Sequence, residues 1–154
     1  MRKRIIRIIS LVLLLLAFIQ IFLLSSQNAA ESSKLSKSVT RKIILFLKNV
    51  KTTNQKNVDE LIKTSESLVR NFAHFLIYIP IGIFSMSFIS TYKIKTKYTI
   101  LICFMFGLSY AILDEVYQGY IPGRASDLKD VFLDMLGVIF GLLLILIITR
   151  KNKD

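Results

Sequence analysis

Four long apolar stretches constrain this 154-residue chain more than any other feature. They cover residues of about 5–24, 72–91, 98–117 and 131–149. Each approaches the roughly 20 residues that a helix needs to cross the hydrocarbon core of a bilayer. Hydrophobic residues make up 53% of the chain, more than in a typical soluble domain. The sequence therefore predicts an all-α fold, a four-helix transmembrane bundle that forms a single domain over residues 1–154.

The first apolar stretch, MRKRIIRIISLVLLLLAFIQ, also has features of a signal peptide. A basic segment opens it, and small residues follow it near Ala29 and Ala30. Its apolar run is longer than that of a typical signal peptide, and the later spans require an N-terminus in the cytoplasm. We therefore expect an uncleaved first span.

The segment that follows the first span predicts an amphipathic helix over 34–50, with Ser32 and Ser33 as candidate N-cap residues. Its apolar residues recur at mostly three- or four-residue spacing: Leu35, Val39, Ile43, Phe46, Leu47 and Val50. Basic residues occupy the other face, which is typical of a helix that lies in the membrane interface. Residues 51–57 form a polar linker, and helical spacing resumes over 58–72 before the second span.

The charge distribution predicts the orientation of the spans. Lys and Arg number 21 against 10 Asp and Glu, and they gather before the first span, over 92–97 and after 149. These alternate loops lie in the cytoplasm by the positive-inside rule, which places both termini there. The loop 118–130 and the long segment 25–70 then lie outside, although 25–70 carries nine Lys or Arg. This pattern indicates a multi-pass membrane protein in contact with lipid and argues against nucleic acid as a partner.

Polar residues at the ends of three spans predict a site, because ionisable groups within spans are costly to bury and usually functional. The second span begins with three polar residues spaced by four, and the third and fourth spans contribute three each. These groups are Arg70, His74 and Tyr78; Asp114, Glu115 and Gln118; and Asp127, Asp130 and Asp134. The predicted topology brings all three groups to the outer end of the bundle, together with Gln27. Gly137 and Gly141 follow and predict a small-xxx-small seam for close helix packing.

A Pro122-Gly123-Arg124 turn connects the last two spans. Pro122 restricts one dihedral angle and Gly123 allows a positive φ, so the turn aims Arg124. Arg124 carries a planar donor fork suited to phosphate or carboxylate. It either pairs with a nearby carboxylate, Asp114, Glu115 or Asp127, or is available for an anionic ligand.

His74 and the tyrosines leave alternatives open. His74 is either an ordinary interfacial histidine or a proton carrier or ligand beside Glu115, since histidine titrates near neutral pH. Tyr78, Tyr117 and Tyr120 are expected in the interfacial aromatic belt. A single histidine and the single, mid-span Cys103 argue against a metal site, and no cofactor motif is present.

The run DEVYQGYIPGRASDLKDVFLDMLGVIFG, residues 114–141, closely resembles the signature of the VanZ-like membrane protein family. That signature reads roughly D-E-x-x-Q-x-x-x-P-G-R-x-x-x-x-x-D-V, then Asn or Asp, then Gly-x-x-x-Gly, and Asp134 stands where many members have Asn. The stretches 22–36 and 70–82 are also similar to the family, so the resemblance covers nearly the whole chain. It implies a bacterial cell-envelope protein of the cytoplasmic membrane with a link to glycopeptide, in particular teicoplanin, resistance.

Three functions remain compatible with these residues. The first is recognition of an anionic lipid-linked or other envelope ligand, for example a polyprenyl-phosphate precursor, at the outer leaflet. The second is an integral-membrane enzyme acting on a lipid or peptidoglycan precursor, with Glu115 or Asp114 as base, His74 as acid–base partner and Arg124 stabilising negative charge. The third is a structural protein whose polar cluster only locks helix ends together. The sequence does not determine the oligomeric state.

Overall fold

The computed structural model describes residues 1–48 and 55–151 of the chain. Its elements in chain order are five helices: α1 (Arg2–Ser25), α2 (Ala29–Lys48), α3 (Gln55–Ile89), α4 (Thr96–Gly119) and α5 (Leu128–Lys151). Four stretches of these helices are long and apolar enough to cross a membrane: Lys3–Ser25, Glu60–Ile89, Thr96–Gly119 and Leu128–Thr149. The prediction of an all-α fold with four spans and an additional helix after the first span is confirmed.

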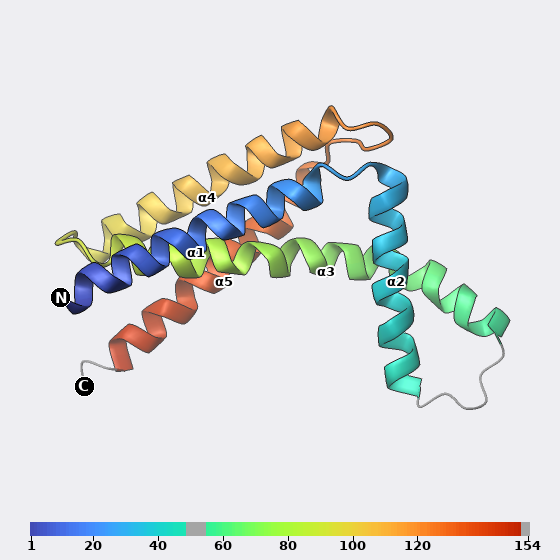
Figure 1. Cartoon of the computed structure of the whole chain (residues 1–154), viewed down its shortest axis with the longest axis horizontal. Helices are drawn as coiled ribbons and strands as arrows, with labels where there is room; N and C mark the ends of the chain where they lie inside the picture. The colour runs from blue at the N-terminus through green and yellow to red at the C-terminus, as the bar shows by residue number, and fades with distance from the viewer. Residues whose placement is uncertain (49–54, 152–154) are drawn as a thin grey trace.

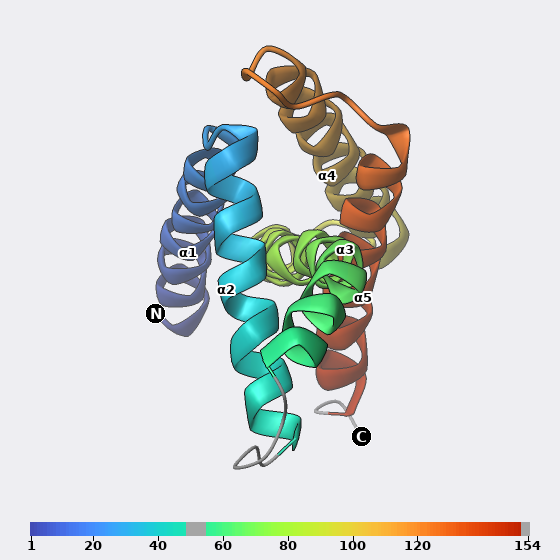
Figure 2. The ribbon, with the colours of Figure 1, turned by 90° about the vertical axis from the view of Figure 1, so that its right-hand side faces the viewer.

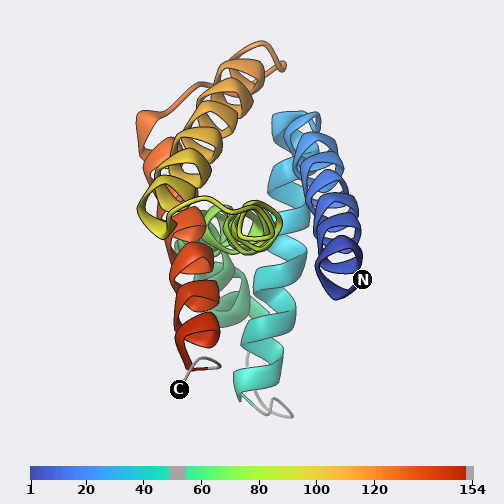
Figure 3. The same cartoon turned by 90° about the vertical axis from the view of Figure 1, so that its left-hand side faces the viewer.

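Helix α3 forms the centre of the bundle and packs against all four other helices. Seen end-on, α3 lies between α1 on one side and α4 and α5 on the other (Figures 2 and 3). The start of α1 and the end of α5 lie at the same end of the bundle (Figure 1). This arrangement follows from the even number of spans.

Glycines bring α3 and α5 into direct backbone contact. A Cβ atom on Gly82 of α3 would clash with the Val138 carbonyl oxygen of α5. In the opposite direction, a Cβ on Gly141 would clash with the Ile79 carbonyl, and one on Gly137 with the Phe75 carbonyl. Lipid supplies no hydrophobic force between spans, so close packing at small residues is a main source of helix association.

Helix α2 stands across the spans at the end of the bundle opposite the N-terminus (Figure 1). Asn28 and Glu31 start this helix with a reciprocal capping box: the Asn28 side chain accepts the Glu31 N–H at 2.9 Å, and Glu31 accepts the Asn28 N–H at 3.1 Å. The expected start near Ser32 or Ser33 is therefore wrong, because Asn28 caps the helix one turn earlier.

The two faces of α2 fit an interfacial position. Thr40 is buried against the bundle, whereas the apolar side chains of Leu35, Val39 and Ile43 are 40–45% exposed and Phe46 is 85% exposed. An exposed apolar stripe on a helix that crosses the spans suits a helix lying at the boundary between headgroups and acyl chains.

Helix α3 begins much earlier than the expected second span. The continuous helix starts at Gln55, and its candidate span starts at Glu60 rather than near residue 72. The first turns of this span are polar on one side, but Ile62 is buried and Glu66 accepts the Ser33 hydroxyl at 2.7 Å. Packing against α2 thus extends the helix beyond its most apolar part. Much of the expected linker at 51–57 lies outside the described residues.

Candidate functional site

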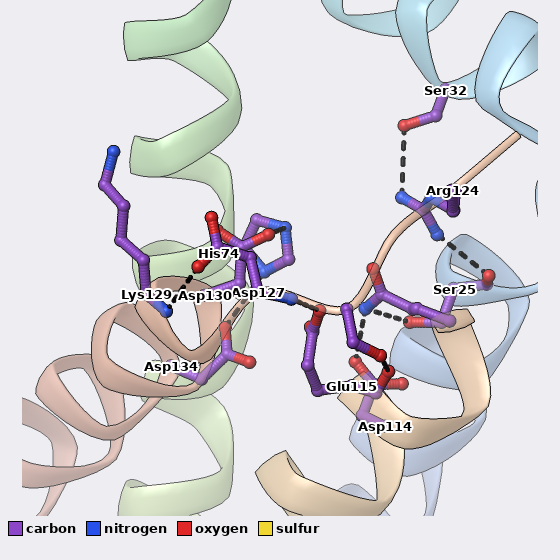
Figure 4. A network of polar contacts seen from close by, with 12 residues as sticks. Ser25, Ser32, His74, Asp114, Glu115, Arg124, Asp127, Lys129, Asp130 and Asp134 are labelled. Atoms are coloured by element: carbon purple, nitrogen blue, oxygen red, sulfur yellow. Dashed lines mark hydrogen bonds and ion pairs between the residues drawn. The ribbon is translucent and has the colours of Figure 1, made fainter.

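Three helix ends and one loop meet at the end of the bundle that α2 crosses. The end of α1 contributes Ser25, the end of α4 contributes Asp114, Glu115 and Gln118, and the start of α5 contributes Asp130 and Asp134. His74 reaches the same region from α3, and Arg124 reaches it from the loop between α4 and α5 (Figure 4). Residues that are distant in the sequence thus form one polar cluster.

The loop that carries Arg124 is a type II turn over residues 121–124. Its Arg124 N–H donates to the Ile121 carbonyl at 3.1 Å, and Gly123 has a φ of +77°. This φ favours glycine, and Pro122 supplies the negative φ that the preceding position requires. The Pro122 carbonyl accepts the Ala29 N–H at 3.4 Å, which ties the turn to the start of α2.

Arg124 extends from this turn toward α1 and α2 (Figure 4). Its Nη1 donates to the Ser25 carbonyl at 2.8 Å, and its Nη2 donates to the Ser32 hydroxyl at 3.2 Å. Its buried Nε has no hydrogen-bond partner among the described residues. Burial lowers the pKa of the Arg124 guanidinium, and the nearby positive charge of Arg70 lowers it further. Arginine nevertheless stays protonated in proteins, so the site contains a partly desolvated cation.

The carboxylates of the cluster have other partners. The Gln118 amide donates to Asp114 at 2.9 Å and also contacts the Ser25 hydroxyl at 3.3 Å. Glu115 accepts the Asp127 backbone N–H. In the described part of the chain, no carboxylate lies within ion-pair distance of Arg124. The expected pairing of Arg124 with Asp114, Glu115 or Asp127 is absent because neutral oxygens of α1 and α2 take its Nη atoms.

His74 lies between two aspartates of α5. Its Nδ1 is 3.1 Å from Asp134 Oδ1, and its Nε2 is 3.6 Å from Asp130 Oδ2. Asp130 and Asp134 are one helical turn apart, so they face α3 together. His74 was expected either as an ordinary interfacial histidine or as a group beside Glu115; its nearest acidic partners are Asp134 and Asp130, because the rotation of α5 turns these aspartates toward the histidine.

Asp127 caps the N-terminus of α5. Its side chain accepts the Lys129 N–H at 2.9 Å, which is the contact of an N-cap residue. Among the described residues, no group of three or more His, Cys, Asp or Glu is arranged to hold a metal ion.

Tyr78 is not at the membrane interface, contrary to expectation. It is fully buried at 0% exposure, and its hydroxyl has no hydrogen-bond partner among the described residues. Tyr117 is half-buried, whereas Tyr120 is 81% exposed. The four-residue spacing from Arg70 through His74 to Tyr78 places all three on one face of α3, and that face turns inward.

A cavity of about 110 Å³ lies between α1, α2, α3 and the Arg124 loop. Its polar lining residues are Ser25, Gln27, Ser32, Ser36, Arg70, His74, Gln118 and Arg124. Of the described residues that line it, none is a carboxylate. We call this space the arginine cavity. Ser25, Ser32 and Ser36 did not stand out in the sequence, because serines near a span end are common and only the fold brings them to Arg124.

A second cavity of about 320 Å³ shares both arginines. Arg70 and Arg124 line it together with Asp127, Lys129 and Asp130. Arg70 and Arg124 therefore lie between the two cavities. The described lining of the arginine cavity is neutral or basic, whereas the lining of the second cavity includes carboxylates.

The fold and this cluster define a polytopic membrane protein with a polar site at one end of its helical bundle. The chain belongs to the VanZ/LLP1 family, whose model matches residues 10–149. This match confirms the resemblance that residues 114–141 predicted. Comparisons with curated proteins and with solved structures found no match.

Proposed function

We propose that this protein recognises an anionic, phosphate-bearing lipid headgroup, such as that of a lipid-linked envelope precursor, at the outer leaflet of the bacterial cytoplasmic membrane. One observation carries the proposal: Arg70 and Arg124 line the same small cavity, and no carboxylate is among its described lining residues. The planar guanidinium fork of arginine matches phosphate oxygens.

The surroundings of Arg124 support a role in binding an anion. A partly buried charge is costly unless it is paired, and among the described residues Arg124 bonds only to the neutral oxygens of Ser25 and Ser32. Arg70 adds a second positive charge nearby. A phosphate between the two guanidinium groups would neutralise both and would satisfy the Nε of Arg124.

The other polar groups of the cluster support the same function. Gln118 engages Asp114, and the backbone of Asp127 engages Glu115, so these carboxylates have partners of their own and act on Arg124 only from beyond ion-pair distance. The hydroxyl of Ser36 and the amide of Gln27 also line the cavity and can donate to phosphate oxygens.

The test is mass spectrometry of the lipids that co-purify with the wild type, Arg124→Ala and Arg124→Lys. We expect a phosphate-bearing lipid to be enriched on the wild type and lost from both variants, because lysine keeps the charge but lacks the fork. Equal retention of that lipid by all three proteins would refute the proposal.

A second candidate is an enzyme acting on the same lipid, and the position of His74 favours it. His74 lines the arginine cavity while Asp134 binds its Nδ1 at 3.1 Å; its Nε2, 3.6 Å from Asp130, lies beyond hydrogen-bond distance and can exchange the proton. A histidine oriented by carboxylates can transfer protons at a bound phosphate ester. Neither Asp114 nor Glu115 is among the lining residues, so His74 carries the acid–base role in this candidate. Conversion of the co-purified lipid on incubation, lost in His74→Gln with lipid retention kept, would establish catalysis.

The orientation of the protein is part of the proposal. The basic ends of the chain and the basic 92–97 loop support cytoplasmic termini, which places the arginine cavity on the outer side. Reporter fusions to the C-terminus and to the loop at residue 125 would report on opposite sides of the membrane. The implied link to glycopeptide resistance predicts a lower teicoplanin tolerance when the protein is deleted.

A further inference from the structure

We infer that the ligand's hydrocarbon chain lies in an apolar groove between α2 and α3, next to the arginine cavity. This inference rests on the proposed function and deepens it, because it assigns a position to the hydrocarbon chain of the lipid as well as to its headgroup. The groove has a volume of about 540 Å³, compared with about 110 Å³ for the arginine cavity. Val39 and Ile43 of α2 line it, together with five residues of α3 between Leu68 and Leu76.

The groove adjoins the arginine cavity. Ala73 of α3 lines both spaces, so the two adjoin at this small side chain. On α2, Ser32 and Ser36 line the cavity, and Val39 and Ile43 line the groove one and two turns further on. A single stripe of α2 therefore changes from polar to apolar with increasing distance from Arg124.

The change from polar to apolar residues along α2 indicates what kind of molecule fits the two spaces. A molecule with a phosphate between Arg70 and Arg124 and an apolar tail directed along α2 matches both parts of the stripe. The groove is open on the side of the lipid, since Leu68 is 69% exposed and Phe72 is 59% exposed. A lipid can therefore enter sideways from the membrane without its chain crossing water. The occupant is therefore one phospho-lipid with at least one long apolar chain.

The chain contains no tryptophan, which allows a direct test. Phe72→Trp places one fluorophore in the groove, and Phe132→Trp places a matched one on α5 outside it. The two phenylalanines are 59% and 63% exposed. They also lie at a similar height in the bundle, because Phe72 precedes His74 by two residues and Phe132 lies between the partners of His74, Asp130 and Asp134.

Each variant is reconstituted as the full chain in phosphatidylcholine vesicles that contain a small fraction of phosphatidic acid brominated on its acyl chains. Bromine quenches tryptophan fluorescence on contact. We expect quenching at least twofold stronger in Phe72→Trp than in Phe132→Trp. Brominated phosphatidylcholine should quench the two variants equally, and adding Arg124→Lys to Phe72→Trp should remove the excess.

The outcomes separate the two proposals. Equal quenching by brominated phosphatidic acid, together with Arg124-dependent lipid retention, overturns the groove and leaves the headgroup site. Excess quenching that persists with Arg124→Lys overturns the inference that one ligand spans both spaces. If inorganic phosphate raises the melting temperature of the wild type but not of Arg124→Lys, and no excess quenching occurs, the ligand is a soluble phosphate and the lipid inference is wrong.

Discussion

Helices α3 and α5 meet in two chemically different ways along their length. In the middle of the bundle, Gly82 and Gly141 bring the two backbones into contact. At the end crossed by α2, the same helices meet through His74 and the aspartates Asp130 and Asp134. The first contact depends on the absence of side chains, and the second depends on buried charges.

This difference separates the source of stability from the source of function. Backbone contact at glycines strengthens association in lipid at no electrostatic cost. Buried ionisable groups must instead be compensated by partners, and a protein gains little stability from them compared with apolar residues of the same size. We therefore expect substitutions in the glycine seam to affect folding alone. Substitutions at the polar end should divide into those that unfold the bundle and those that only remove ligand binding.

The largest effect is expected for His74→Leu. It removes the partner of Asp134, which is 0% exposed and whose Oδ2 already lacks a partner in the described residues. Loss of one member of a buried pair costs about 3–5 kcal/mol of unfolding free energy. Denaturant unfolding in detergent measures the effect. The double variant His74→Leu with Asp134→Leu is the control and should recover part of this loss; a double variant as unstable as the single one would contradict the expectation.

Gly141→Ala should have the next largest effect. The added methyl group would clash with the backbone of α3 at Ile79, and overpacking costs about 1–3 kcal/mol. The measurement is the melting temperature in detergent. Gly119→Ala is the control, since its methyl group would meet a side chain, that of Ser126, rather than a helix backbone; we expect a smaller loss that reflects the hydrogen bond from the Ser126 hydroxyl to the Glu115 carbonyl. Equal melting temperatures for the two variants would mean that α3 and α5 do not pack this closely.

Arg124→Lys should separate binding from stability. Lysine can keep one of the two hydrogen bonds to Ser25 and Ser32, so we expect a loss of about 1 kcal/mol in unfolding free energy. Retention of the phospho-lipid should fall at least tenfold. If Arg124→Lys instead destabilises the protein as much as His74→Leu, and lipid retention is unchanged, the polar cluster is a structural clasp.

The smallest effect is expected for Arg7→Lys at the opposite end. The Arg7 guanidinium stacks on the Tyr92 ring at 4.1 Å, and its Nε donates to Thr91 at 3.0 Å. Replacing this arginine with lysine weakens the cation–π contact, so we expect the unfolding free energy to fall by about 0.5–1 kcal/mol. Lipid retention should be the same as in the wild type. A loss of phospho-lipid in Arg7→Lys would show that retention depends on general positive charge rather than on the arginine cavity.

Much of the fold was predictable because its signals are local. Each apolar stretch is long enough to span a membrane, and the predicted spans overlap the observed helices. The Pro122-Gly123 turn was also predictable, since each residue restricts or permits a specific φ. The start of α2 at Asn28 could have been found from the Asn-x-x-Glu pattern of a capping box.

The pairings within the site were not predictable in the same way. Spacing within α5 placed Asp130 and Asp134 on one face, but it did not tell which helix that face meets. Tyr78 looked like an interfacial residue because its position near the start of a span is shared by belt tyrosines. It is buried because α3 begins about four turns before Arg70 and packs against all four other helices.

The amino-acid sequence by itself determined that the chain crosses a membrane through four helices and that polar residues gather at the ends of three of them. Hydrophobicity and residue identity act locally, so they can be read one segment at a time. Only the tertiary structure decided that Arg124 bonds to Ser25 and Ser32, and that His74 meets two aspartates. These contacts depend on how each helix rotates and crosses its neighbours, and that geometry arises from packing between segments far apart in the chain.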